Sequence, residues 1–490
     1  MTHWANEVTV DRGDCGAITG IQTPRIQIHK RGTDCGRRTE VKLVITNEDN
    51  RGNIWLGETQ PKLITGRRSR GPAMQLGDWA IEQAHPSPRY IWEEVNKKIA
   101  LHKGGKRDEE LILPLNSSLS ISLHQDQLKS TTTAVASPAF SEDKLWLNGQ
   151  EKSVQESRLQ ALLHEVRRRA AKRPLEDVQR EEEVVESVNS EHRLAPPSWH
   201  VHISSKNNFP TGAGLASSAS GYACLAFTLA QLFGVRGELS GIARRGSGSA
   251  CRSMYGGVVR WTHGEQADGA DSIAVQVIPE SYWPELRVFI LVVSDLQKAV
   301  SSSEGMRRSV ATSRLLQHRA TVLVPELLRK AEAAVKAHDF PAFSQLAMCD
   351  SNQLHAICLD THPPIFYLND TSRQIMRLVH AYNQACAEIR AGYTFDAGPN
   401  AFVLTTARDA SKLLGLIAHF FPPQTSNSKR YIRGLPLTTD PPSLELQCAL
   451  GFEPQPNALH YILCTRPGPG PQCIFDNEAH LLNIDGLPGN

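Results

Sequence analysis

The sequence lacks the patterns that mark secreted, membrane-spanning or disulfide-linked proteins. Its ten cysteines are scattered and form no Cys-x-x-Cys pair, so neither a zinc site nor a disulfide framework is indicated. The longest strongly apolar run, Val288–Val293, is far too short to cross a membrane. Residues 1–30 have no apolar core of a secretory signal, and they carry Asp11 and Asp14, which a transit peptide usually avoids. These absences predict a cytoplasmic protein with reduced thiols and no membrane span.

The sequence also lacks a strong charge of either sign and several well-known catalytic motifs. A formal net charge of +2 argues against a mainly electrostatic partner such as nucleic acid. There is no Gly-x-x-x-x-Gly-Lys-Ser/Thr loop and no His-Glu-x-x-His motif, and Gly246–Ser249 has the wrong spacing for a serine-hydrolase elbow. The composition is that of a globular protein, with 40% hydrophobic and 21% charged residues, and the length has room for two or three domains.

Residues 1–104 differ from the rest of the sequence. Glycine and arginine recur there without a period, and hydrophobic alternation is short, as in Val41–Ile45. We expect an atypical N-terminal extension. The pattern fits a disordered segment, a small extra domain or translated sequence foreign to the rest of the chain, and it does not separate these. No functional site is assigned to it.

Asn207–Gly221 is a loop of small residues. A strand of alternating pattern that begins near Trp199 precedes it, and a long apolar helix begins at its end. Such a loop presents unpaired backbone N–H groups at the positive end of the helix dipole, and both favour a bound phosphate. The hydroxyls of Ser217 and Ser218 add two donors. On these residues alone, an ordinary tight turn with a serine cap is an equally good interpretation.

Two further stretches carry residues suited to anion chemistry. Ala243–Ser253 combines small hydroxyls, glycines and arginines, which suit anion contacts, although a surface turn has a similar composition. In Tyr393–Leu404, Asp396 stands beside Ala-Gly-Pro-Asn, directly before a short strand. An aspartate in a tight turn commonly bonds only its own backbone, which is the favoured interpretation of this stretch taken alone.

Taken together, these stretches resemble the diphosphomevalonate decarboxylase family, within the superfamily of galactokinase, homoserine kinase, mevalonate kinase and phosphomevalonate kinase (GHMP). The resemblance covers roughly residues 105–488. Residues 214–218 read Gly-Leu-Ala-Ser-Ser, as in the decarboxylases, where the kinases usually carry Gly-Leu-Gly-Ser-Ser. The segments that carry the resemblance are Gly105–Glu110, Leu113–Ser120, Asn207–Gly221, Arg244–Ser253 and Tyr393–Ala401.

The resemblance implies an α+β fold of two GHMP-kinase-type domains, an ATP-binding domain at residues 105–286 and a C-terminal domain at 287–490, with the active site in the cleft between them. It implies the conversion of ATP and mevalonate 5-diphosphate to isopentenyl diphosphate, carbon dioxide, ADP and phosphate, as part of isoprenoid biosynthesis. It also implies Mg²⁺ as cofactor and a homodimer as the assembly.

The resemblance further implies roles for individual residues. Asp396 is similar to the catalytic aspartate that orients or deprotonates the tertiary hydroxyl of the substrate. Arg252 looks like the arginine that clamps the substrate carboxylate. The residues implied in substrate binding are Ser247, Ser249, Arg252 and Lys106. Those implied in ATP binding are Gly212, Ala213, Gly214, Leu215, Ala216, Ser217, Ser218, Asn116 and Ser117, with Ser217 or Ser218 toward Mg²⁺.

The sequence departs from the pattern of the family at one place, and this departure leaves alternative functions open. The family enters its Gly-Lys-Arg-Asp motif through a strand that ends in Lys-Tyr-Trp, but Val95–Gly104 has neither the Tyr nor the Trp, and Lys103 is a poor counterpart of the Lys. Our hypothesis is that residues 1–104 replace the usual first strand. An inactive pseudoenzyme or dimer partner is therefore one alternative, although Asp396 and Arg252 are retained. A GHMP-type small-molecule kinase is another, and the absence of carbon dioxide release would distinguish it.

Overall fold

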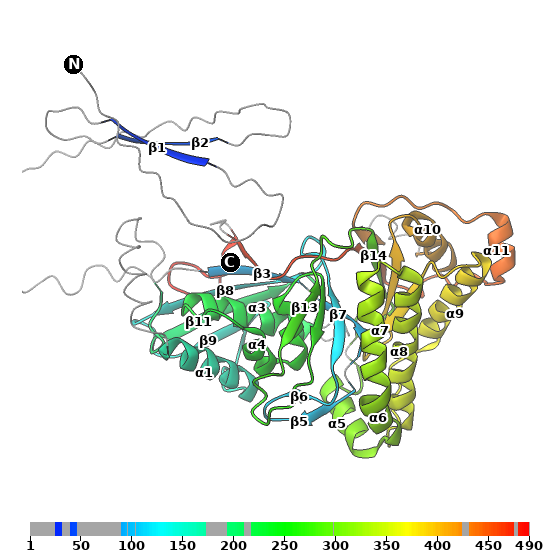
Figure 1. The fold of residues 1–490 in the computed structure, drawn as a ribbon, viewed down its shortest axis with the longest axis horizontal. Helices are drawn as coiled ribbons and strands as arrows, with labels where there is room; N and C mark the ends of the chain where they lie inside the picture. The colour runs from blue at the N-terminus through cyan, green and yellow to red at the C-terminus, as the bar shows by residue number, and fades with distance from the viewer. Residues whose placement is uncertain are drawn as a thin grey trace, which may run out of the picture. The chain divides into compact units, whose positions relative to one another are not determined.

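The computed structural model describes residues 25–31, 40–46, 90–95, 97–102, 104–172, 194–209, 217–296, 298–423, 431–474 and 479–489. The chain divides into two units, Met1–Glu82 and Gln83–Asn490. In the first unit, β1 (Arg25–Arg31) pairs antiparallel with β2 (Glu40–Thr46). Most of the predicted N-terminal extension lies outside the described residues. The elements below all belong to the second unit (Figure 1).

A six-stranded sheet with the order β10-β9-β11-β8-β3-β19 forms the first layer of this unit. The helices α1 (Ser157–Ala171), α3 (Ser217–Leu232) and α4 (Ser240–Gly246) bury their apolar faces together with it, and Leu162, Ala226 and Ile203 are almost fully buried in this core. The strands are β3 (Tyr90–Val95), β8 (Lys129–Ser137), β9 (Lys144–Leu147), β10 (Gln150–Lys152), β11 (His200–Asn207) and β19 (Gln472–Ile474).

A second, four-stranded sheet has the order β13-β12-β7-β4. Its strand β7 is buried along its whole length, and Leu119 and Ile121 of β7 join the core that also holds residues of the C-terminal helices. The strands are β4 (Lys97–Leu101), β7 (Ser118–Ser122), β12 (Val258–Trp261) and β13 (Ala274–Ile278), and a short pair, β5 (Lys106–Asp108) and β6 (Leu113–Pro114), lies between β4 and β7 in sequence.

The hypothesis that residues 1–104 replace the first strand is wrong. β3 pairs antiparallel with β8, and β4 pairs antiparallel with β7, with Lys97 opposite Ser122. β4 lies at the edge of its sheet, where charged residues such as lysine are common because they discourage pairing with other chains. Lys97 and Lys98 therefore fit a strand that ends at Leu101, separated by three residues from the Gly-Lys-Arg-Asp motif.

A five-stranded sheet with the order β15-β16-β14-β18-β17 organises the C-terminal half. Alternate residues of β14 face two different cores: Val288 and Ile290 pack with α7 and α8, whereas Phe289 and Leu291 pack with α9 and α10. This confirms the prediction that Val288–Val293 is a buried strand. The strands are β14 (Leu286–Val292), β15 (Gly392–Phe395), β16 (Ala401–Thr406), β17 (Ile432–Gly434) and β18 (Tyr461–Thr465).

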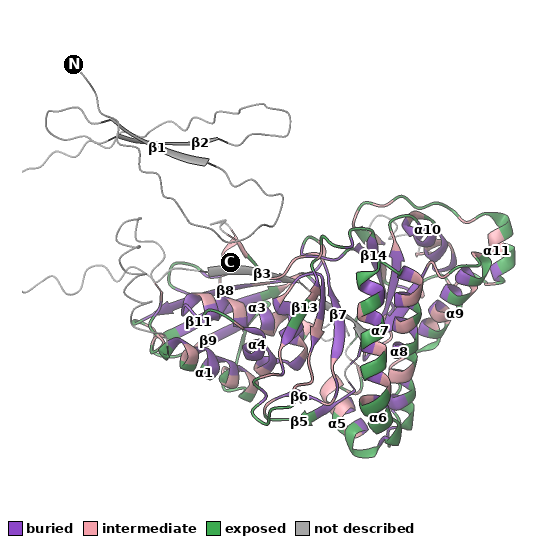
Figure 2. Cartoon of the chain, viewed as in Figure 1, coloured by how far each residue is buried: buried purple, intermediate pink, exposed green. Residues whose placement is uncertain are grey.

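Helices cover both faces of this sheet, and its strands β14, β15 and β16 are mostly buried (Figure 2). α7 and α8 lie side by side in Figure 1. The helices are α5 (Ser302–Thr312), α6 (Arg314–His318), α7 (Val324–Lys336), α8 (Phe340–Asp360), α9 (Asp370–Ala385), α10 (Ala410–Phe420) and α11 (Leu444–Leu450). Two halves of mixed helix and sheet give the predicted α+β class, and we propose residues 286 and 287, where β14 begins, as the domain boundary.

None of the helices in the described ranges is both long and apolar enough to span a membrane.

Glu165 of α1 provides a pH-dependent contribution to stability. Its carboxylate accepts hydrogen bonds from Arg168 and Arg169, and Arg169 also donates to the carbonyl of Glu238. Burial raises the pKa of Glu165, but the two arginines outweigh it and lower the pKa from 4.5 to about 2. A lowered pKa stabilises the fold above pH 4.5, and this stabilisation is lost as the pH falls toward 2.

We therefore expect E165Q to destabilise the protein by about 1–2 kcal/mol at pH 7. The difference in urea midpoint between wild type and E165Q should narrow as the pH falls from 5 to 3. E142Q is a suitable control because Glu142 is exposed and pairs with Lys144 at 3.4 Å on the surface. A difference for E165Q that is independent of pH would contradict this account.

Candidate active site

A cavity of about 590 Å³ is lined by residues from both halves of the unit. Its polar wall is rich in hydroxyl groups, and Asp396 contributes a carboxylate. β9, α1 and α3 contribute many of the cavity's apolar side chains. The predicted residues that line the cavity are Lys106, Ser217, Ser218, Ser247, Ser249 and Asp396, and the apolar ones include Leu145, Leu147, Leu159, Tyr222 and Leu225.

Asp396 is held in place by bonds on both sides of its turn, which connects β15 to β16. The Phe395 N–H donates to Ser351 Oγ at 2.9 Å. Asn400 Oδ1 accepts from the backbone of Val293 and Ser294 at the end of β14, and Asn400 Nδ2 donates back to the Ser294 carbonyl. The turn is therefore fixed to the central strand of the sheet, and it presents Asp396 to the cavity.

Arg252 lies in the short helix Gly248–Met254, is completely buried and is not among the residues that line the cavity. Its Nη1 donates to Ser118 Oγ at 2.5 Å, while Nε and Nη2 have no hydrogen-bond partner among the described residues. Burial lowers the pKa of Arg252, and the nearby Cys251 and Asp396 oppose this shift. An incompletely paired buried guanidinium is costly, so its two unused nitrogens favour binding of an anion.

Lys298 was missed by the sequence reasoning, although it lines the cavity next to Asp396. Its Nζ donates to Ser302 Oγ at 2.6 Å and to the Ala397 carbonyl at 3.0 Å. Burial lowers the pKa of Lys298, and the charge of Asp396 opposes this shift. Lys298 therefore joins the aspartate turn to the N-terminus of α5.

Ser217 and Ser218 begin α3 and line the cavity, as do Ser247 and Ser249 on either side of Gly248. The start of a helix carries N–H groups that take no part in its internal hydrogen bonds, and hydroxyls supply further donors, which together suit a phosphate. The rest of the predicted phosphate loop, Gly212, Ala213, Gly214, Leu215 and Ala216, lies outside the described residues.

Three other predicted site residues, Lys106, Asn116 and Ser117, make hydrogen bonds within the fold. Lys106 is buried, lines the cavity and donates to Glu109 Oε2 at 2.5 Å. Asn116 and Ser117 do not line the cavity. Asn116 accepts from the N–H of Gly104 at 2.9 Å and donates to the His102 carbonyl at 3.2 Å, while Ser117 Oγ accepts from a backbone N–H. Asn116 therefore fixes the backbone that precedes the Gly-Lys-Arg-Asp motif, whereas Ser117 fixes the backbone at His263, after β12.

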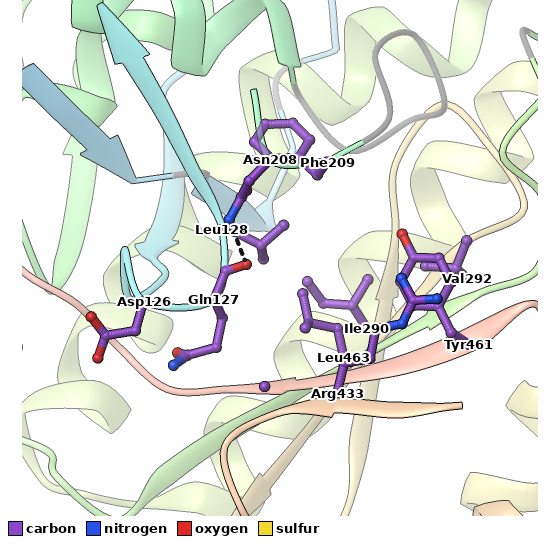
Figure 3. A pocket seen from close by; sticks show the side chains of 11 residues that line it. Asp126, Gln127, Leu128, Asn208, Phe209, Ile290, Val292, Arg433, Tyr461 and Leu463 are labelled. Carbon is purple, nitrogen blue, oxygen red and sulfur yellow. Dashed lines mark hydrogen bonds between the residues drawn. The ribbon is translucent and has the colours of Figure 1, made fainter. Parts of the chain in front are cut away.

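The described residues contain no cluster of three or more His, Cys, Asp or Glu that could hold a metal ion by itself. A second pocket of about 210 Å³, shown in Figure 3, shares no lining residue with the first cavity. It is lined by Leu128, Phe209, Ile290 and their neighbours, and Arg433 lies 4.0 Å over the ring of Tyr461. It contains none of the predicted site residues.

Comparison with known proteins places both halves of the chain in one group. Residues 95–274 match a family model described as the diphosphomevalonate decarboxylase-like N-terminal domain, and residues 288–474 match the mevalonate 5-diphosphate decarboxylase C-terminal domain. The first match includes the whole of β4, in agreement with the pairing of that strand. The chain is 54% identical to the diphosphomevalonate decarboxylase of Homo sapiens over 384 residues, which are 78% of this chain and 93% of the relative. The Bos taurus relative is 53% identical with the same coverage.

Solved structures agree. A mevalonate diphosphate decarboxylase from Trypanosoma brucei superposes with a TM-score of 0.69 at 32% identity, covering 81% of this chain and 100% of the other. A structure described as MDDEF in complex with MVAPP, AMPPCP and magnesium superposes with a TM-score of 0.59 at 29% identity, covering 79% and 99%. The predicted GHMP-kinase-type architecture is thereby confirmed.

Proposed function

Since the chain belongs to the diphosphomevalonate decarboxylase family, we propose that it converts ATP and mevalonate 5-diphosphate to isopentenyl diphosphate, carbon dioxide, ADP and phosphate. The observation that carries the proposal within this structure is the grouping of one carboxylate, Asp396, with the cations of Arg252 and Lys298 beside a hydroxyl-rich cavity. Phosphoryl transfer followed by loss of a carboxylate requires such charges at fixed positions and little covalent chemistry from the protein.

In this proposal Asp396 orients the tertiary hydroxyl of the substrate and accepts its proton as the oxygen attacks the γ-phosphate of ATP. Arg252 offers Nε and Nη2 to the carboxylate, in the forked geometry that carboxylates fit best. Ser247, Ser249 and Lys106 bind the remaining anionic oxygens of the substrate. When the phosphate leaves the tertiary carbon, positive charge develops there, and the electrons of the carboxylate bond form the new double bond.

In this proposal the nucleotide occupies the part of the cavity that lies at the start of α3. Ser217 and Ser218, with the preceding loop, bind the ATP phosphates, and the apolar side chains of Leu145 and Leu159 face the base. Mg²⁺ usually keeps several waters and binds through substrate phosphates with few protein ligands. The donor set fits this mode, with Ser217 or Ser218 as the protein ligand, and the ion would neutralise phosphate charge.

The basic test is an assay of the full-length chain with ATP, Mg²⁺ and mevalonate 5-diphosphate that follows ADP and carbon dioxide together. Equal amounts of the two products are expected. ADP without carbon dioxide would indicate a kinase, and neither product from a folded chain would indicate a pseudoenzyme. The pairing of β3 and β4 counts against the pseudoenzyme alternative, although the Tyr and Trp whose absence motivates it are still missing before the Gly-Lys-Arg-Asp motif.

Two further properties are proposals from the resemblance alone, a homodimer and a cytoplasmic location. Light scattering of the purified chain should give about twice the 54.1 kDa of one chain. A mass of one chain at assay concentrations would contradict the dimer.

Replacement of Lys298 should reduce the activity moderately. K298M removes the bond to the Ala397 carbonyl and a positive charge beside Asp396, so both the aspartate turn and nearby phosphate charge lose support. We expect kcat/KM to fall about 10-fold to 100-fold, as for loss of a hydrogen bond to a charged group. Steady-state kinetics check this, with the exposed Lys336 replaced in the same way as the control. Wild-type kinetics for K298M would show that the lysine acts only in holding α5.

A further inference from the structure

His102 follows the edge strand β4, and its side chain is buried among charged groups of α8. Both the backbone N–H and Nδ1 of His102 bond to Asp350 Oδ2, at 2.7 and 2.8 Å. Arg319 donates to the other oxygen of Asp350 and, at 3.1 Å, to the His102 carbonyl. His102 is only 2% exposed, and Asp350 and Arg319 are equally buried. This network joins residues that lie more than 200 positions apart.

The network fixes the orientation of the imidazole. Burial alone would raise the pKa of Asp350, but Arg319 and His102 outweigh burial and lower it. Asp350 is therefore a carboxylate that can only accept hydrogen bonds, so Nδ1 of His102 carries a hydrogen and donates it. Nε2, on the other side of the ring, is buried and has no hydrogen-bond partner among the described residues.

His102 lines the same cavity as Asp396. The charged and titratable groups around it are Asp350 and His355 from α8, Arg319 from the segment between α6 and α7, and Asp396 from the β15–β16 turn. Burial lowers the pKa of His355 to about 4, with a further contribution from His102, so His355 stays neutral. Because Asp350 and Arg319 balance each other, a proton on Nε2 would need an anion in the cavity to compensate its charge.

We propose that His102 binds an anionic oxygen of the substrate through Nε2 as an imidazolium, and that it takes up the required proton when the substrate binds. Asp350 keeps Nδ1–H in place and stabilises the imidazolium, as the aspartate does in a catalytic triad. The inference rests on the proposed function, because mevalonate 5-diphosphate supplies the anionic oxygens, either carboxylate or diphosphate. An unsatisfied buried Nε2 is costly without such a partner.

The test is calorimetric titration of mevalonate 5-diphosphate into the full chain, without ATP, in buffers of different ionisation enthalpy at one pH. The buffer dependence counts the protons taken up. H102N retains a donor for Asp350 at the position of Nδ1 but has no group at Nε2, whereas H102K supplies a permanent positive charge. The control is H318N, because His318 is exposed and outside the cavity.

We expect wild type and H318N to take up the same fraction of a proton, and H102N and H102K to take up less. H102N should bind at least 10-fold more weakly, as expected for loss of a hydrogen bond between charged groups. Titration of isopentenyl diphosphate, which has no carboxylate, shows which group supplies the anionic oxygen. Proton uptake that persists with this compound assigns His102 to the diphosphate. Proton uptake that disappears assigns His102 to the carboxylate.

Equal proton uptake and affinity in wild type, H102N and H102K, with normal turnover by wild type, would overturn this inference and leave the proposed function standing. Failure of wild type to bind or convert mevalonate 5-diphosphate would overturn both. If H102N does not fold, as judged by circular dichroism, the comparison of wild type with H102K still decides the matter. H102K that matches the proton uptake of wild type counts against the imidazolium.

Discussion

Replacing Asp396 with asparagine should lower kcat by about 10²-fold to 10⁴-fold while the protein stays folded. Asparagine has nearly the same shape, so the turn between β15 and β16 should keep its hydrogen bonds through Phe395 and Asn400, which involve backbone atoms and the Asn400 side chain. What is lost is the negative charge beside Lys298 and Arg252 and the ability to accept a proton from the substrate hydroxyl. The loss should therefore appear in kcat much more than in substrate binding.

The measurement is single-turnover formation of ADP and carbon dioxide by D396N, with the affinity for mevalonate 5-diphosphate determined separately. The matched control is D409N, since Asp409 is a buried aspartate of the same half that pairs with Arg390 and Arg408 and does not line the cavity. D409N should lose stability and keep most of its activity. If D396N retains wild-type kcat, Asp396 is a turn residue that bonds its own backbone, the interpretation that the sequence alone favoured.

The sequence was sufficient to indicate residues of the cavity that lie in continuous motifs. Asp396, Ser217, Ser218, Ser247 and Ser249 each lie within a run of small residues at the end of a strand or the start of a helix, and all of them line the cavity. The buried strand β14 was likewise visible as a continuous apolar run, because both faces of a central strand are apolar.

The sequence was insufficient where the site is assembled by tertiary contacts. His102 and Asp350 are 248 positions apart, and nothing near either of them indicates the other. Lys298 stands in a polar loop with no period, and only the fold places it at the Ala397 carbonyl. β4 was missed for a different reason: its lysines fit an edge strand, whose pattern is weaker than that of a half-buried inner strand. The resemblance implies that Asn116 binds the nucleotide, and this stays a prediction; in the fold its amide bonds to the backbone of His102 and Gly104.

Replacing Arg252 with lysine should lower kcat/KM by about 10²-fold or more. The guanidinium is fully buried, is anchored through Nη1 to Ser118, and retains two nitrogens without a hydrogen-bond partner in the described part of the chain. A lysine keeps the charge but has a single nitrogen, so it cannot hold Ser118 and clamp a carboxylate in a forked geometry at the same time. Because a misplaced carboxylate is poorly aligned for loss of carbon dioxide, the defect should affect kcat as well as KM.

A second buried arginine supplies the control for this prediction. Arg244 donates to the backbone carbonyls of Leu111 and Gly269, so both of its terminal nitrogens are used within the fold. R244K should therefore reduce thermal stability with little change in kcat/KM, whereas R252K should show the opposite pattern. The two variants carry the same chemical change at similar burial. The Nε of both arginines has no hydrogen-bond partner in the described part of the chain, but only Arg252 also has an unpartnered terminal nitrogen, Nη2, beside it and can offer a ligand two adjacent donors. Loss of stability without loss of activity in R252K would mean that Arg252 holds Ser118 in place and contacts no substrate.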